Sequence, residues 1–437
     1  MGSRDLPPAL AARRTSLTLE DVVALALVGS PAVRASWAVA RAAAAGYGAA
    51  RGDLFPEVTG DASVTRIKTA ATQGRSAVLQ TVYEPSVSFT WLLLDVGGRS
   101  GTIRASRNEL ISANWTHNAT LQGVVARAAG AYFDYAAARA LLAAQQTTLR
   151  EAEVNLTAAE ERRRVGVATI ADVLQARTAA AQARLDLQAV EGNLLTTRGA
   201  LAAATGYPAT LEYDIDTTSV EAPVKIIAER IDTLIQTALR ERPDLMAAYA
   251  DYDAARARVR AARGQRLPSV TAGGATGVNF QPGQSGGRSS YNLTLGLSIP
   301  LFNGFAWEYN QQRAEAQAEA AQAQAQGLAQ QVIFQVFQAY YVLRTATVRV
   351  GTAEELLASA SESADAARGR YRGGVGSLLE LLSAENALAS ARAQRIQARL
   401  GWQAALVQLA LQSGLLDLRG GSTLRLGPAP SPSDTLP

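Results

Sequence analysis

The chain has 437 residues, and its 42 lysines and arginines stand against 38 aspartates and glutamates, which gives a net charge of only +4. A charge balance this close to neutral does not indicate a nucleic-acid partner, and we expect none. The sequence has no cysteine and a single histidine, His117, which excludes disulfides, thiolate zinc sites, cysteine nucleophiles and histidine metal clusters.

The first residues do not have the pattern of a membrane or export signal. Residues 1–16 contain no apolar core, and Glu20 and Asp21 separate the pair Arg13-Arg14 from the apolar run 22–29. Acidic residues at that place are not typical of a twin-arginine signal. We therefore expect 1–16 to be a disordered segment of a mature or trimmed chain. No window approaches the about 18–20 uninterrupted apolar residues of a membrane-spanning helix.

The rest of the chain is a tandem duplication. Arg51-Gly52-Asp53-Leu54-Phe55-Pro56 matches a segment 212 positions later, and Ala131-Tyr132-Phe133 matches Ala339-Tyr340-Tyr341, 208 positions later. A repeat of about 210 residues is too long for a solenoid unit. The sequence predicts a first repeat at 17–206, a linker at 207–230, a second repeat at 231–414 and a flexible tail at 415–437.

Each repeat begins with a helix and continues with two strands. Alanine- and arginine-rich helices are predicted at roughly 31–54 and 243–266, and Pro56 and Pro268 end them. Apolar and polar residues then alternate with period two, which indicates strands. The predicted strands are about 57–67, 84–94, 269–280 and 290–301.

Two long helices complete each repeat. The first is predicted at about 99–165 and 305–373, and the second at about 169–205 and 377–413. The second helices begin with Thr169-Ile170-Ala171-Asp172 and Ser377-Leu378-Leu379-Glu380. This hydroxyl-x-x-acid spacing is typical of a capping box.

The alternating strands have one apolar and one polar face. Such strands suit a barrel wall in lipid around a wet lumen. Four strands do not close a barrel, and an open edge is not tolerated in lipid. Either several chains pool their strands, or the strands form a soluble packed sheet. We favour pooling, because no other segment is an obvious cover for the apolar face.

This order of elements resembles the TolC family of outer-membrane efflux proteins over about residues 17–414. The segments Leu94-Asp95-Val96-Gly97-Gly98-Arg99 and Pro300-Leu301-Phe302-Asn303-Gly304 look like the family's exit from strand to helix. Arg163-Arg164-Val165-Gly166 and Arg370-Tyr371-Arg372-Gly373-Gly374 look like its hairpin tips.

The resemblance implies a mainly α-helical protomer with a transmembrane β-barrel. Three copies, a homotrimer, would form a 12-stranded barrel in the Gram-negative outer membrane and a long α-helical tunnel through the periplasm. It also implies a periplasmic adaptor and an inner-membrane pump, proton-driven or ATP-driven. The protein would be a passive exit channel for small toxic compounds, with no enzyme activity and no cofactor. The alternative is the outer-membrane duct of a type I protein or peptide secretion system.

The resemblance also suggests functional residues. Glu380 matches an acidic position that narrows the family's pore entrance, and the alternative is that it serves only as a helix cap. Ser383 stands where the family often has a second acid, and Asp172 is the counterpart of Glu380 in the first repeat, where capping alone is favoured. These three are the pore-gate candidates.

Two further sets complete the prediction. The tip candidates share a place at the ends of the long helices, where arginines either complement the helix dipole or contact an adaptor. They are Arg163, Arg164, Gly166, Arg370, Arg372, Gly373 and Gly374. The candidates for facing outer-membrane lipid are the apolar members of the alternating strands: Val87, Phe89, Trp91, Leu293, Leu295 and Leu297.

Overall fold

The computed structural model describes residues 16–70, 74, 78–209, 214–216, 230–281 and 286–416. The predicted tail from 417 onward, residues 1–15 of the N-terminal segment and most of the linker lie outside this part of the chain. The described residues divide into two compact units. Unit 1 comprises residues up to Ser36, Thr116–Leu245 and residues from Ala329 onward, and unit 2 comprises Trp37–Trp115 and Met246–Leu328. Each unit therefore takes segments from both repeats.

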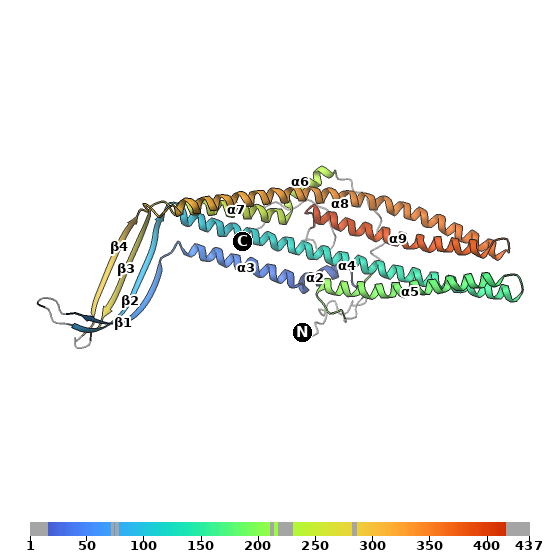
Figure 1. Ribbon diagram of the computed structural model, residues 1–437, viewed down its shortest axis with the longest axis horizontal. Coiled ribbons are helices and arrows are strands. Elements are labelled where there is room, and N and C mark those ends of the chain that lie inside the picture. The colour runs from blue at the N-terminus through green and yellow to red at the C-terminus, as the bar shows by residue number, and fades with distance from the viewer. Residues whose placement is uncertain are drawn as a thin grey trace. The chain divides into compact units, whose positions relative to one another are not determined.

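The two repeats contain the same series of elements (Figure 1). The first has α2 (Leu19–Gly29), α3 (Pro31–Gly52), β1 (Glu57–Thr69), β2 (Val78–Asp95), α4 (Gly98–Arg164) and α5 (Ile170–Thr205). The second has α6 (Ile231–Glu241), α7 (Pro243–Gly264), β3 (Ser269–Asn279), β4 (Arg288–Ser298), α8 (Ala306–Arg372) and α9 (Leu378–Gln412).

Unit 2 contains an antiparallel sheet with the order β1-β2-β3-β4. β2 begins at Val78, earlier than the predicted residue 84, because 78–83 pair with 64–69 of β1. A bulge interrupts the pairing of β2 with β3 between Leu92 and Leu94. A bulge inserts one residue without a partner, so Leu94 and not Leu93 continues the alternation. The period-two alternation of residues 86–94 predicts Leu93 as the next member of the apolar row after Trp91, and this prediction is wrong.

The junction of β2 and α4 is fixed by side chains of unit 2. The Arg99 guanidinium donates to the backbone oxygens of Asp53 and Leu92 at 2.9 and 2.7 Å. The carboxylate of Asp95 accepts from the Arg99 backbone N–H at the start of α4. A carboxylate at this place satisfies a backbone donor that has no partner inside the helix. These contacts hold the end of α3 beside the start of α4.

Unit 1 contains the largest apolar core. Residues of α2, α4, α5 and α9 join it, among them the fully buried Tyr132 and Leu201, together with the fully buried Leu17 just before α2. Residues 214–216 cross α4 here: Arg139 donates to Asp214 Oδ1 at 2.9 Å and to the Ile215 oxygen at 2.7 Å. Within the described part of the chain, no single helix is long and apolar enough to span a membrane, and one bent pair, α2 with α3, passes that test by length and composition.

Candidate channel surfaces

Where all four strands pair, the sheet has one apolar and one polar face. Residues that lie directly opposite each other in neighbouring strands point to the same face. One such row is Val58, Phe89, Gly274 and Leu293. A Cβ atom on Gly274 would lie 2.6 Å from the Phe89 ring and 2.8 Å from Leu293, so glycine leaves the space in which these two side chains meet.

The predicted apolar strand residues all lie on this face. Trp91 is opposite Ala272, which is opposite Leu295, and Val270 is opposite both Leu94 and Leu297. Leu293 and Leu295 are about three-quarters exposed. Exposed leucines in a continuous row need a cover from outside this chain, because apolar surface of this extent is unfavourable in water.

The opposite face is hydrophilic. Its rows include Thr59, Ser88, Ala275 and Asn292, and next to them Asp61, Ser86, Gly277 and Ser290. This face suits contact with water, and the two faces together match the wall of a water-filled passage.

The helical hairpin tips end in two turns of the same design. After α4, Gly166 N–H donates to the Arg163 oxygen at 3.0 Å and Val167 N–H to the Arg162 oxygen at 2.8 Å. After α8, Gly374 and Val375 repeat these bonds at 3.2 and 3.0 Å. This is the Schellman pattern, which places a glycine in the left-handed region.

The glycines of the tips have different roles. Gly166 and Gly374 have φ of 84° and 77°. The sequence pattern at the tip also predicts a left-handed Gly373, and this prediction is wrong, because Gly373 does not have positive φ and directly follows Arg372, the last residue of α8. Val165, Val167 and Val375 are about two-thirds to three-quarters exposed at these turns. The tips therefore present apolar side chains beside arginines such as Arg163, Arg164 and Arg372.

The two acidic gate candidates make different contacts. Asp172 completes a capping box, because its carboxylate accepts from the Thr169 backbone N–H at 2.8 Å while the Thr169 hydroxyl accepts from Asp172 N–H at 3.2 Å. The Ser377 hydroxyl likewise accepts from the Glu380 backbone N–H at 3.2 Å. The Glu380 carboxylate instead pairs with the Arg370 guanidinium, at 2.9 Å. Ser383 is exposed on the same helix.

The two hairpins are joined near their tips. Arg162 of α4 donates to the Tyr371 oxygen of α8 at 2.8 Å, and its guanidinium lies 4.7 Å from the centre of the Tyr371 ring. Below this contact, Val173 and Ala176 of α5 pack in one buried cluster with Leu381 of α9. Residues from both repeats thus form this end of unit 1.

A polar network between α4 and α9 was not found by sequence reasoning. Glu385 accepts from the Asn155 amide and lies 3.4 Å from Arg368, and Arg392 pairs with Glu151 at 2.9 and 3.2 Å. Burial raises the pKa of Glu385, and the Glu151 charge raises it further, whereas Arg368 lowers this pKa. No motif marks these residues, because they are far apart in sequence and meet only through helix packing.

Comparison with known proteins identifies the class. Residues 22–207 and 234–415 match the family described as Outer membrane efflux protein, one match for each repeat. Protein CyaE of Bordetella pertussis is 31% identical over 89% of this chain and 82% of its own length. The probable efflux pump outer membrane protein TtgC of Pseudomonas putida is 27% identical over 87% of this chain and 80% of its own length.

Solved structures share the fold. The outer membrane protein VceC of Vibrio cholerae has a TM-score of 0.79 at 22% identity, over 91% of this chain and 96% of that one. A CusC structure has a TM-score of 0.81 at 22% identity, over 91% and 92%. The chain belongs to the outer membrane efflux protein family, and the predicted fold class is confirmed. It is an efflux channel protein of the Gram-negative outer membrane and extends into the periplasm.

Proposed function

We propose that the protein is the exit duct of a tripartite efflux system and passively conducts small toxic compounds out of the cell. An inner-membrane pump would supply the energy, and a periplasmic adaptor would link the pump to the duct. Relatives of this chain include a toluene efflux pump outer membrane protein, 26% identical, and the cation efflux system protein CusC, 25% identical. Their names support organic compounds or metals as the class of substrate, and the name of the antibiotic efflux pump outer membrane protein ArpC, 27% identical, supports drugs.

The two-faced sheet is the observation that carries this proposal. Its apolar rows suit lipid, its polar rows suit a wet lumen, and β1 and β4 are its edges. Because unpaired backbone groups are costly in lipid, the edge β4 of one copy would pair with β1 of the next. Three copies, a homotrimer, would then contribute twelve strands to one closed wall.

The hairpin tips are the proposed adaptor contact. Their exposed valines give an apolar centre, and Arg163, Arg164, Arg370 and Arg372 surround it with positive charge. Gly166, Gly373 and Gly374 shape the turns. The variant Arg372→Glu should reduce co-purification of the adaptor with the channel, and unchanged recovery of the adaptor would contradict this assignment.

Export in cells is the test of the function. The chain would be expressed with a signal peptide and its adaptor and pump in cells that lack their own outer-membrane channel. Accumulation of a panel of toxic small molecules should fall. An inserted oligomer that does not change accumulation would instead favour the duct of a protein or peptide secretion system. Absence of an oligomer from the outer membrane would contradict the proposed function.

A further inference from the structure

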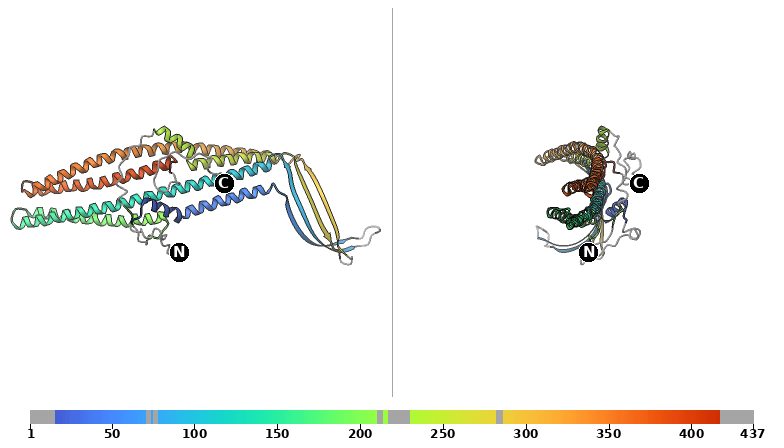
Figure 2. Two further views of the ribbon diagram at one scale, coloured as in Figure 1. Left: turned by 180° about the vertical axis from the view of Figure 1, so that it is seen from behind. Right: turned by 90° about the vertical axis from the view of Figure 1, so that its right-hand side faces the viewer.

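The strands β1 and β2 continue past the ends of β3 and β4 as a two-stranded ribbon (Figures 1 and 2). Residues 65–69 of β1 pair with 78–82 of β2 there. Just before the ribbon, Tyr83 of β2 pairs with Phe280, and their backbone groups exchange two hydrogen bonds of 3.0 and 2.9 Å. The pairing of β1 with β2 has no register shift, so the two faces of the sheet can be followed into the ribbon.

The apolar face of the sheet becomes basic where the ribbon begins. Val64 and Tyr83 are the last apolar pair on this face, and Arg66 and Lys68 follow on the same side of β1. Both basic side chains are exposed, and neither forms an ion pair with another described residue. Charged residues do not belong to the lipid-facing band of a barrel, so this band ends near Tyr83.

The polar face changes in the opposite sense. Ile67 and Val82 continue it into the ribbon, and Val82 is only 8% exposed. The acidic residues of the four strands all lie on the polar face: Glu57, Asp61, Glu84 and Asp95. The outer side of the ribbon, which continues the apolar face, therefore carries positive charge alone. The hydroxyl residue Thr81 lies on that side, directly opposite Arg66.

The length of the apolar face places these cations at a membrane surface. On β3 it runs from Val270 to Phe280, ten residues, which is about 34 Å of strand. At a strand tilt of about 40° this distance spans roughly 26 Å, close to the band of about 25 Å in membrane barrels. Arg66 and Lys68 then lie about 5 and 10 Å beyond the band, at the depth of lipid headgroups.

The ribbon belongs to the outer leaflet. The long helices α4 and α8 follow β2 and β4 at the other end of the sheet, after Asp95 and Ser298, and the channel extends into the periplasm on that side. Tyr83, Phe280 and Tyr291 lie on the apolar face near the ribbon and are 46, 45 and 82% exposed. Exposed aromatic side chains are typical of the border between hydrocarbon and headgroups.

We propose that Arg66 and Lys68 bind the phosphate group of an outer-leaflet lipid, with the Thr81 hydroxyl as a further donor. The acyl chains of this lipid would lie on the apolar rows below, so the inference rests on the proposed lipid contact of that face. Guanidinium and ammonium groups form charge-assisted hydrogen bonds with phosphate oxygens. A soluble anion would gain nothing from the apolar rows, whereas a lipid uses both surfaces. The three residues are called the rim site below.

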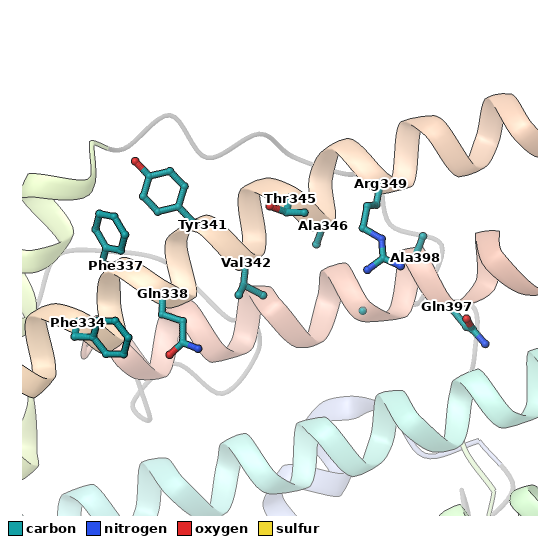
Figure 3. Close-up of a pocket in the computed structure, with 11 residues that line it drawn as sticks. Phe334, Phe337, Gln338, Tyr341, Val342, Thr345, Ala346, Arg349, Gln397 and Ala398 are labelled. Atoms are coloured by element: carbon teal, nitrogen blue, oxygen red, sulfur yellow. The ribbon is translucent and has the colours of Figure 1, made fainter.

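The groove of about 600 Å³ between α8 and α9 is a different kind of surface (Figure 3). The Phe337 and Tyr341 rings stand 4.7 Å apart in it, and Arg349 lies at its border. Helices of unit 1 form this groove, whereas strands of unit 2 form the rim site. Aromatic side chains beside a cation thus do not by themselves indicate lipid. The position of the rim site beyond an apolar face of membrane thickness is the feature that does.

Binding to the purified full-length channel tests the rim site. The probe is lipid A, a phosphorylated and acylated glucosamine disaccharide, and native mass spectrometry measures the bound lipid. The double variant Arg66→Gln, Lys68→Gln should bind about tenfold more weakly than wild type. Arg288→Gln is the matched control and should bind normally, because Arg288 lies at the same end of the sheet but on the polar face, opposite Asn279. Lipid A without its phosphates should bind wild type as weakly as lipid A binds the double variant.

The outcomes separate the rim site from the proposed barrel. Equal binding of lipid A to wild type and the double variant would reject the rim site alone, as would an equal loss in Arg288→Gln. A wild-type channel that binds neither form of the lipid would contradict the lipid-facing assignment of the apolar rows. Displacement of lipid A by inorganic phosphate, beyond the effect of sodium chloride at the same ionic strength, would overturn a lipid as the ligand.

An exchange of two neighbouring residues tests the side of the ribbon. The variant Thr65→Arg, Arg66→Thr keeps the composition and moves the charge to the other side. It should bind lipid A as weakly as the single variant Arg66→Thr. Recovery of binding in the exchange variant would mean that nearby charge is sufficient on either side, which contradicts the rim site.

Chemical labelling of Lys68 gives a reading that needs no variant. Lys68 and Lys225 are the only lysines of the chain. Acetylation of Lys68 in the wild-type channel should slow severalfold when lipid A is added and should not slow with the dephosphorylated lipid. The reaction of Lys225 measures the free reagent. Equal acetylation of Lys68 with and without bound lipid A would overturn its contact with the phosphate.

Discussion

At the scale of single residues, Glu380 differs from its counterpart in the first repeat. Both acids follow a hydroxyl residue at the start of a helix, yet only Asp172 returns its carboxylate to the cap. Glu380 gives its carboxylate to Arg370 across the turn. The Glu380 carboxylate is not held by a cap, so ions in a passage can compete with Arg370 for it. The gate role of Glu380 therefore remains our proposal.

Replacement of Glu380 by glutamine tests that role. The change keeps the shape of the side chain and removes its charge in every copy. Preference for cations over anions should fall, and the channel conductance should change, as measured by reversal potential and current in a planar bilayer. Asp172→Asn is the matched control and should leave both values unchanged. Selectivity and conductance equal to wild type in Glu380→Gln would end the gate assignment.

The half-buried Glu385 gives a prediction about pH. Its raised pKa means that the folded protein binds the carboxyl proton more tightly than the unfolded chain does. The stability from this group is therefore complete below the ordinary glutamate pKa and is lost as pH rises through the raised, folded-state pKa. Glutamine mimics the neutral form, so Glu385→Gln should unfold at an equal or higher temperature than wild type at pH 7.

The difference in melting temperature between Glu385→Gln and wild type should narrow as pH falls from 7 toward 5. Thermal unfolding followed by circular dichroism measures it. Glu362→Gln, at an exposed position of α8, should show no such trend. A difference that grows toward low pH would mean that the ion pair with Arg368, rather than burial, dominates at this site.

At the scale of elements, the turns after α4 and α8 each depend on one left-handed glycine. Alanine at Gly374 would be forced to a φ near 77°, which costs about 1–2 kcal/mol. Gly374→Ala should therefore lower the unfolding free energy of the hairpin by about that amount. Gly373→Ala should cost less, because Gly373 lacks positive φ and a Cβ there would meet its nearest atom at 3.5 Å. The unfolding free energies would be measured by denaturant unfolding. Equal losses in Gly374→Ala and Gly373→Ala would contradict this view of the turn.

The helices and strands could be predicted because the sequence patterns that mark them are local. Period-two alternation and alanine-rich stretches are local properties, and they led to the fold class that the structure and relatives confirm. The bulge at Leu93 was missed because Leu92, Leu93 and Leu94 are all apolar, so composition does not reveal which one lacks a partner. The network around Glu385 was missed for a different reason: its members come from three helices, and sequence spacing does not place them together.

At the scale of the whole molecule, the apolar face of the sheet determines where the protein resides. Leu295→Arg would place a charge on that face, at a cost of up to about 2–4 kcal/mol near the middle of a bilayer. Insertion into the outer membrane should fall, as measured by membrane fractionation. Thr294→Arg is the matched control, because Thr294 lies next to Leu295 in sequence but on the polar face of the sheet, and this variant should insert normally. Equal insertion of the two variants would contradict the assignment of the faces.

The continuity of the rows has a consequence for biogenesis. In each of the four strands, a shift by one residue would move the side chains of the apolar face to the polar face and bring the other set in their place. A row such as Val58, Phe89, Gly274 and Leu293 is apolar at each strand, so a single misplaced strand would present its polar side chains to lipid. We therefore expect a misregistered chain to insert into the membrane less readily than a correctly paired one, so that insertion itself would select for correct strand pairing.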